Sequence, residues 1–404
     1  MSVLRERDFR LLFLGSSGSW FGDRMVNIAL AFAVLGLDGS ASDIGIVFAA
    51  RAAPLVACLL AGGVVADRVP RRALMVVCDV VRLAAHGLMA GLLIAGAAEI
   101  WMLAVLAGIG GAATGFFSPA STGLMPAVVA PEQLQQANGL RAIGQGAGEI
   151  GGPVLAGLLV ASVGAGWAMA VDAATFGLSA VCLLALRLPP HLPPAAKTFI
   201  ADLREGWSAF VSRRWVWSFV AAAMLGNACW GAWSVLGPVI AERDFGGPAV
   251  WGLILGVFGA GSLVGGVIAV VWTPRRPVVV ATLTVGLFSL PLAFLALGVS
   301  APVVALSAGL SGAGLMLSNT IWESTIQRHI PQETLSRVSA YDWFGSLAIQ
   351  PVGMAIWGPI AAAIGFGASL WIAFSVQVLA ALALLAIREV RELGPYPEPA
   401  SARS

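Results

Sequence analysis

Twelve apolar runs, each long enough to cross a lipid bilayer, constrain the fold of this chain more than any other feature. A membrane-spanning helix needs about 20 consecutive, mainly apolar residues. Runs of this kind lie at 9–36, 43–66, 73–95, 100–124, 139–163, 167–187, 214–241, 250–272, 277–297, 302–324, 341–364 and 367–388. Only 11% of the residues are charged, whereas a soluble domain carries about 25%. We therefore predict an all-α integral membrane protein with twelve transmembrane helices.

The basic residues in the connections between these runs predict the orientation. Every Lys and Arg in the connections and terminal segments falls on one side, except Arg243. Because positively charged loops stay in the cytoplasm, both termini are expected there. Lys197 is the only lysine, beside 22 arginines, a bias typical of GC-rich bacterial genomes. We expect a multi-pass protein of the bacterial cytoplasmic (inner) membrane.

A proline-rich stretch, LPPHLPP, divides the chain into halves that resemble each other. Proline cannot continue a helix, so we predict an N-terminal six-helix bundle at 1–188 and a C-terminal one at 214–390, with a cytoplasmic tail at 391–404. Pro131 and Pro331 occupy matching positions in similar segments, as expected for two pseudo-symmetric bundles. The linker at 189–213 has apolar residues at helical spacing, which predicts an amphipathic helix on the membrane surface or docked on the bundles.

The inventory of reactive residues argues against an enzyme. Lys197 follows alanine, so the chain has no P-loop. The four cysteines each stand alone in an apolar run, which indicates core residues rather than disulfides or metal ligands. A net charge of +2 gives no reason to expect nucleic acid as a partner. We expect no cofactor and no metal, with the lipid bilayer, a small molecule and protons as partners.

The charged segment between the second and third runs carries the pattern G-x-x-x-D-R-x-x-R-R. A short cytoplasmic loop collects arginines for topological reasons alone, but the glycine and the acid at fixed offsets need another explanation. The pattern resembles the signature loop of the major facilitator superfamily, in which glycine usually stands at Pro70. The resemblance implies that Asp67 docks on the N-terminus of the eleventh helix. It implies a conformational switch made by Gly63, Asp67, Arg68, Arg71, Arg72 and Asp342.

The fifth run carries a second family-like pattern. It resembles the motif G-x8-G-x3-G-P-x2-G-G of facilitator exporters, with Ala156 in place of one glycine. Glycines four residues apart let a neighbouring helix approach closely, and proline allows a bend. The pattern favours export over import. Its matching residues are Gly139, Gly148, Gly152, Pro153 and Gly157.

Ionisable residues within the runs are candidates for ion coupling, since each charge costs about 2.5–3.5 kcal/mol to insert. Asp23, Glu149 and Glu323 are the proton-coupling candidates. The alternative for Asp23 and Glu149 is a structural ion pair with Arg24 or Arg51.

The third run adds an acid, a base and an imidazole at i, i+3 and i+7, which places Asp79, Arg82 and His86 on one helix face. These residues could form a proton relay, but their position near the cytoplasmic end favours a pair that braces the charged loop. Asp172, near a span end, is expected to act as a similar structural charge.

Further short matches narrow the resemblance. Asp79-x2-Arg82, Phe117-x-Pro119-Ala120 and Asp172-Ala173 look like the enterobactin-exporter and macrolide-efflux branch of the superfamily. The fourth run lacks the arginine that many drug-proton antiporters keep there. If the family arrangement holds, polar and aromatic residues of several spans line a substrate cavity, although interfacial anchoring is the default for tryptophan. The cavity candidates are Asn27, Arg51, Asn227, Trp230, Trp233, Asn319 and Trp322.

These observations predict a secondary transporter that exports an amphipathic small molecule, such as a drug or a siderophore-like compound, by proton antiport and alternating access. Two alternatives remain open. One is a lipid or lysolipid flippase on the same fold, and the other is a membrane sensor that does not transport.

The topology is testable with single cysteines at Asp38 and Glu99, which lie in predicted outer connections. A membrane-impermeant thiol reagent added to intact cells should label both substituted positions, because these loops face outward. Labelling confined to inside-out vesicles would show that the predicted orientation is wrong.

Overall fold

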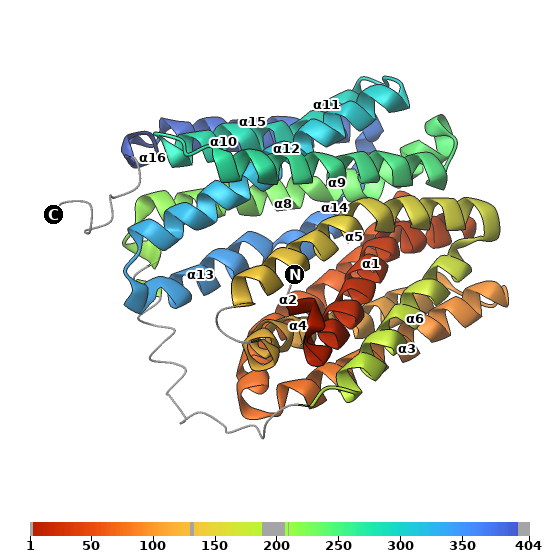
Figure 1. Ribbon diagram of the computed structural model, residues 1–404. Coiled ribbons are helices and arrows are strands. Elements are labelled where there is room, and N and C mark those ends of the chain that lie inside the picture. Colours follow the sequence, from red (N-terminus) through yellow and green to blue (C-terminus); the bar gives the residue numbers. More distant parts are fainter. Residues whose placement is uncertain (1–2, 130–132, 188–206, 209, 395–404) are drawn as a thin grey trace. The chain divides into compact units, whose positions relative to one another are not determined.

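The computed structural model describes residues 3–129, 133–187, 207–208 and 210–394, and within them every regular element is helical (Figure 1). Residues 188–206, which hold most of the linker and its predicted helix, lie outside this description, as does most of the tail. The side chains at 60, 63, 64, 66, 67, 122, 123, 126, 127, 134, 135, 332, 333, 336, 337 and 340 also lie outside it.

Each predicted span coincides with one helix or with consecutive helices, so the predicted architecture is confirmed. The first six spans are α1 (Arg7–Gly36), α2 (Ala41–Arg68), α3 (Arg71–Ile94), α4 (Ile100–Val128), α5 (Leu134–Val163) and α6 (Ala165–Leu184). The other six are α8 (Arg214–Ile240) followed by η3 (Ala241–Phe245), α9 (Pro248–Val271), α10 (Pro277–Gly286) with η4 (Leu287–Ser289) and α11 (Leu290–Ala296), α12 (Ala301–His329), α13 (Gln332–Leu347) with α14 (Gln350–Ile364), and α15 (Phe366–Ala386). The short η1 (Val3–Arg5) and α16 (Arg388–Glu392) lie at the two ends.

In the described part of the chain, eleven helical segments are long and apolar enough to cross a membrane. Helix α1 is not among them, although it is 30 residues long. Its middle holds three serines, Asp23 and Arg24. Polar residues in the middle of a span are unfavourable in lipid and mark functional sites, so the middle of α1 is a candidate functional region.

The chain forms two compact units. Unit 1 contains Met1–Ala195, Ser234–Gly256 and Met354–Ala363, and unit 2 contains Ala196–Trp233, Val257–Gly353 and Ile364–Ser404. In unit 1, α2 packs on α4, α3 packs on α4 and α6, and α1 packs on α5 and α6. In unit 2, α10 and α11 pack on α12 and α15.

Glycines set the closest helix contacts within each unit. In unit 1, a Cβ on Gly115 of α4 would lie 2.6 Å from the Leu55 carbonyl oxygen and 2.9 Å from the Cys58 Cβ of α2. In unit 2, a Cβ on Gly261 of α9 would collide with the backbone of Gly309 in α12. The corresponding helix pairs of the two halves therefore meet through the same kind of small-residue interface.

The two halves also end matching helices in the same way. Gly96 after α3 and Gly298 after α11 have φ values of 67° and 64°. The next amide at each end reaches back to a helix carbonyl, with Ala97 N to Leu92 O at 3.0 Å and Val299 N to Phe294 O at 3.4 Å. These are glycine-terminated helix ends with left-handed backbone, and their recurrence supports the internal repeat.

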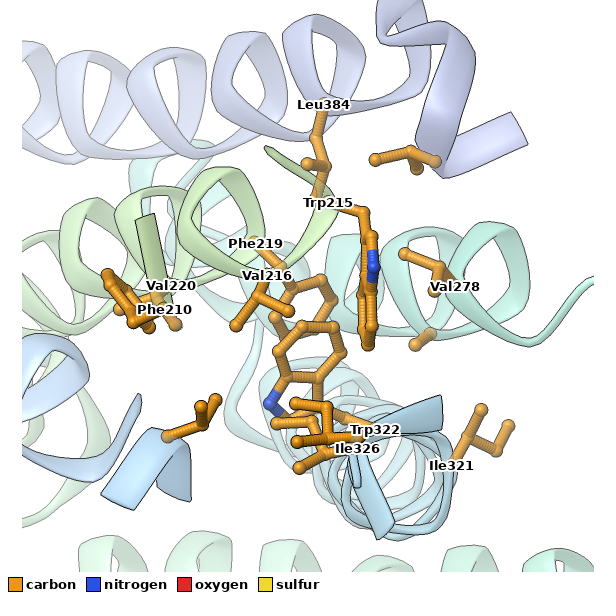
Figure 2. Close-up of a cluster of buried hydrophobic side chains, with 14 of the residues drawn as sticks. Phe210, Trp215, Val216, Phe219, Val220, Val278, Ile321, Trp322, Ile326 and Leu384 are labelled. Atoms are coloured by element: carbon orange, nitrogen blue, oxygen red, sulfur yellow. The ribbon is translucent and has the colours of Figure 1, made fainter. Parts of the chain in front are cut away.

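An aromatic and aliphatic cluster fills the core of unit 2. Trp215 and Phe219 of α8 meet Trp322 of α12, with Phe219 stacked on Trp322 at 3.8 Å between ring centroids (Figure 2). Ile326 and Leu384 complete the same cluster. Burial of these large side chains fixes α8, α12 and α15 against one another.

The glycine contacts predict unequal effects of one methyl group. Gly115→Ala should destabilise the purified protein by about 1–3 kcal/mol, because the new Cβ meets backbone that cannot move aside. Gly87→Ala in α3 is the matched control, since nothing lies within 4 Å of its Cβ position. Thermal unfolding in detergent should show a lower melting temperature for Gly115→Ala only. Equal melting temperatures for the two variants would show that the close contact at Gly115 does not limit the packing of α4 on α2.

Candidate functional site

The polar centre of α1 is part of a buried charge cluster that joins α1, α2, α3 and α6 within unit 1. We call Asp23, Arg51, Asp79, Arg82, His86 and Asp172 the charge cluster. Arg82 forms ion pairs with Asp79, one turn earlier in α3, and with Asp23, whose Oδ2 lies 3.6 Å from Arg82 Nη1. Arg51 Nη2 lies 3.8 Å from the other oxygen of Asp23. Asp23 therefore lies between two guanidinium groups from different helices.

The Arg82 side chain is almost fully buried, at 1% exposure. Its guanidinium carbon lies 4.2 Å from the ring centroids of both Phe117 in α4 and Phe176 in α6. Cation–π contacts of this kind are stronger when water is excluded. The two rings hold the guanidinium where both carboxylates can reach it.

His86 and Asp172 form the second part of the charge cluster. His86 Nδ1 contacts an Asp172 oxygen, and both side chains are buried. The imidazole meets Phe176 edge-on, at 5.3 Å between centroids and 77° between planes. A Cβ at Gly110 of α4 would lie 2.5 Å from His86 Nε2. Glycine at this position leaves the space that the imidazole occupies.

Three acids and two arginines leave the charge cluster one positive charge short when His86 is neutral. Asp23 Oδ1 and Asp172 Oδ1 accept no hydrogen bond from any described residue, although both atoms are buried. A buried carboxylate oxygen without a donor is unfavourable in a low-dielectric interior. These two oxygens can therefore still accept a hydrogen bond that the described residues do not supply.

The charge cluster corrects two expectations. Asp79 and Arg82 were expected to brace the charged loop, and Asp172 to act as a charge at a helix end. All three side chains are instead buried and contact one another or their neighbours across helices. Their spacing along α3 was visible in the sequence, but their pairing with α1 and α6 depends on which helix faces meet.

Glu149 pairs with Arg24, outside the charge cluster. The pair joins α5 to α1 and is partly exposed, at 29% and 52% of the side-chain surfaces. Asn27 accepts a 2.8 Å hydrogen bond from Arg51 Nη1. The ion pairs predicted as the alternative for Asp23 and Glu149 thus match the observed geometry. The Asp23 side chain is slightly more buried than that of Glu149.

The exporter-like motif explains how α5 approaches its neighbours in unit 1. A Cβ on Gly152 would lie 2.7 Å from the Arg24 Cβ and 2.8 Å from the Phe21 carbonyl oxygen, and Gly148 faces Phe21 at 3.4 Å. Gly157 meets α9, with its Cβ position 3.1 Å from the Gly252 Cα. Gly139 has open space, while Pro153 lies inside the helix.

The charged loop is described only in part, because the surroundings of Gly63 and the side chain of Asp67 lie outside the description. Arg68 is exposed. Arg72 donates to the carbonyl oxygens of Leu186 at 2.9 Å and Leu184 at 2.7 Å, at the C-terminus of α6. A cation stabilises a helix C-terminus, so Arg72 ties α3 to α6.

Unit 2 contains a pocket of about 250 Å³ between α8, α10, α12, α13 and α15. Phe219, Trp322 and Leu384 of the aromatic cluster form part of its wall (Figure 2). Polar residues from α8, α10, α12, α13 and α15 line the pocket. They include Asn227, Asn319, Glu323, Asp342 and Gln377.

Asp342 has a partner within unit 2 that sequence reasoning missed. Its two carboxylate oxygens accept hydrogen bonds from the Trp322 indole Nε1 at 3.1 and 3.2 Å. Asn227 Nδ2 donates to the Ser346 carbonyl oxygen at 2.9 Å. The pocket thus gathers three of the predicted cavity residues, Asn227, Asn319 and Trp322, together with Glu323.

Trp230 and Trp233 do not line this pocket. Trp230 stacks on Phe288 at 3.9 Å and on Trp233 at 5.4 Å between centroids. Trp233 is 1% exposed. Both indoles act in aromatic packing, which the sequence could not separate from a cavity role because the two environments favour the same residue type.

Loss of the central guanidinium should be costly. Arg82→Gln leaves Asp23 and Asp79 without their shared cation and should lower unfolding free energy by about 3–5 kcal/mol. Arg24→Gln, in the half-exposed pair, should cost about 1 kcal/mol or less. The melting temperatures of the variants measure this difference. The double variant Arg82→Gln/Asp79→Asn should recover part of the stability that Arg82→Gln loses. Equal melting temperatures for the two single variants would refute this account.

Known proteins resemble the chain over most of its length. The Major Facilitator Superfamily profile matches residues 12–349. The multidrug efflux pump Tap of Mycobacterium tuberculosis is 28% identical over 403 residues, covering 93% of both chains. The pump of the same name in Mycolicibacterium fortuitum is 26% identical, covering 99% of this chain and all of the relative. Macrolide efflux protein A of Streptococcus pyogenes is 22% identical over 64% of this chain and 65% of its own.

Solved structures share the fold. A nucleoside transporter superposes with a TM-score of 0.76 at 14% identity, covering 95% of this chain and 99% of its own. A bacterial homologue of the human lysosomal transporter Spinster superposes with a TM-score of 0.74 at 15% identity, covering 97% of this chain and 98% of its own. The helical architecture, the internal repeat and the family match agree, and the chain belongs to the Major Facilitator Superfamily of membrane transporters.

Proposed function

We propose that the chain exports amphipathic small molecules from the bacterial cytoplasm in exchange for protons, by alternating access. The observation that carries the proposal is the charge cluster, which holds buried carboxylate oxygens that accept no hydrogen bond from the described residues. A structural ion pair does not need a carboxylate oxygen without a hydrogen-bond donor. An acid that alternately binds and releases a proton needs such an oxygen, because the proton binds there.

Asp23 is the member best placed to exchange protons with solvent. Its side chain is 24% exposed, whereas those of Asp79 and Asp172 are fully buried. Arg82 and Arg51 stabilise its charged form, and protonation would free the two guanidinium groups to relax toward other partners. Proton binding at Asp23 would therefore change the forces that hold α1 to α2 and α3.

His86 and Asp172 extend the path from Asp23. An imidazole nitrogen can accept or donate a proton, and Asp172 of the pair interacts electrostatically with Asp23. In this proposal one proton on the charge cluster brings its net charge to zero, whether Asp23 or the His86–Asp172 pair holds it. Glu149, paired with Arg24, serves packing of α5 on α1.

Export, rather than import, is supported by the relatives, which are named as efflux proteins, and by the exporter-like motif of α5. The charged loop completes the proposal as a conformational switch. Arg72 anchors it to α6, and Asp67 would make the contact that exists in only one state of the cycle. The basic connections favour a cytoplasmic location for this loop and both termini.

The test is proton-driven uptake into everted membrane vesicles, in which export appears as accumulation. Asp23→Asn should reduce accumulation by at least about tenfold, equivalent to a loss of about 1.4 kcal/mol of coupling. Downhill equilibration of the same compound should persist, because the gradient of the compound itself drives it and no proton exchange is needed. Glu99→Gln, an exposed acid outside the helices, is the matched control.

Accumulation by Asp23→Asn equal to that of the unmodified protein would eliminate the coupling role. Loss of both accumulation and equilibration would instead point to a structural role for Asp23.

A further inference from the structure

The pocket of unit 2 has acidic groups without a basic counterpart. Glu323 and Asp342 both line it, and none of its described lining residues is Lys, Arg or His. Its volume of about 250 Å³ suits a small ligand or the polar end of a larger one. The electrostatic character of this pocket therefore favours a positively charged guest.

The two acids differ in their partners. Asp342 is 9% exposed and is held by the Trp322 indole N–H. Glu323 follows Trp322 in α12. It forms no hydrogen bond or ion pair with any described residue, is exposed and lines the pocket. A carboxylate within a membrane span is stabilised by a cation or by a proton. Glu323 is free to pair with a cation that enters.

Gln377 adds an independent observation from a different helix. It lies in α15, is 6% exposed and lines the pocket, yet its Oε1 accepts no hydrogen bond from the described residues. A buried amide oxygen without a donor is unfavourable unless a ligand supplies one. An ammonium N–H would satisfy it, whereas an anionic group would not.

Aromatic rings supply the remaining recognition. Phe219 and Trp322 stack on each other, and Phe288 and Trp343 also face the pocket. Trp343 is 56% exposed, so its indole is available to a guest. Cations bind to the faces of tryptophan and phenylalanine rings, while apolar parts of the guest gain from the same surfaces.

We infer that this pocket binds monovalent organic cations, foremost protonated amines with an apolar body. The inference deepens the proposed function by naming a substrate class. Glu323 pairs with the cationic nitrogen, the Gln377 amide oxygen accepts its N–H, and the aromatic wall receives the apolar part.

Equilibrium binding to the purified full-length protein in detergent tests this inference without requiring transport. Benzyldimethylamine, which is protonated at neutral pH, should bind, as should benzyltrimethylammonium. Phenylacetate, of similar size and opposite charge, should not. Calorimetry of Glu323→Gln should show a Kd for both cations weakened by at least about tenfold. Glu242→Gln, an exposed acid of η3 in unit 1, should behave as the unmodified protein.

Two further variants separate the roles of the polar groups. Gln377→Leu should weaken the binding of benzyldimethylamine more than that of benzyltrimethylammonium, because only protonated benzyldimethylamine has an N–H. Asn319→Lys places a positive charge one turn before Glu323 and should abolish cation binding. Melting temperatures of all variants establish that they are folded, and Glu323→Asp should retain part of the affinity.

Equal affinity for phenylacetate and benzyldimethylamine would overturn the inference, as would unchanged cation binding by folded Glu323→Gln and Asn319→Lys. If everted vesicles still accumulate neutral or anionic compounds against a gradient, the export proposal survives that failure. Cation binding without any proton-driven accumulation would instead overturn the export proposal and leave the pocket assignment in place.

Discussion

The burial of Arg82 is the interaction on which the first unit depends. Its guanidinium lies between two phenylalanine rings and within ion-pair distance of Asp79 and Asp23. A lone charge at this depth would destabilise the bundle. With two acids around it, the same charge links α1 to α3 and sets the position of α4 and α6 through Phe117 and Phe176.

In the proposed function this arrangement would couple stability to protonation. Each acid of the charge cluster that takes up a proton weakens its attraction to the arginines, so the contacts that hold α1 depend on occupancy by protons. Such dependence is a requirement for exchange transport, in which an ion must bias one conformation over another. Asp23, whose side chain is 24% exposed, is the least buried acid of the charge cluster.

The two halves share their helix packing but differ in where their charged residues lie. Their helix pairs meet through small residues and end in matching glycine turns. The charge cluster has no counterpart among the described residues of unit 2, where two acids face a pocket walled by aromatic rings. The second copy of the charged loop, ending at Arg275 and Arg276, has likewise lost the acid that corresponds to Asp67.

The fold was predictable from the sequence because bilayer thickness fixes the length of an apolar run. Even the glycine pattern of α5 anticipated its approach to α1 at Gly148 and Gly152. The charge cluster was predictable only in part. Asp23 stood out as a charge in mid-span, but its link to Arg82 and the pairing of His86 with Asp172 arise from helix rotation in the folded bundle. The sequence likewise did not show that Trp233 is buried against Trp230.

The most direct measurement of the central claim is proton release on substrate binding, followed with a pH indicator in weakly buffered detergent solution. If Asp23 and its partners hold an exchangeable proton, adding a transported compound should release protons in a saturable manner, and Asp23→Asn should abolish the release. Saturable binding of the compound with no proton release from the unmodified protein would contradict the account.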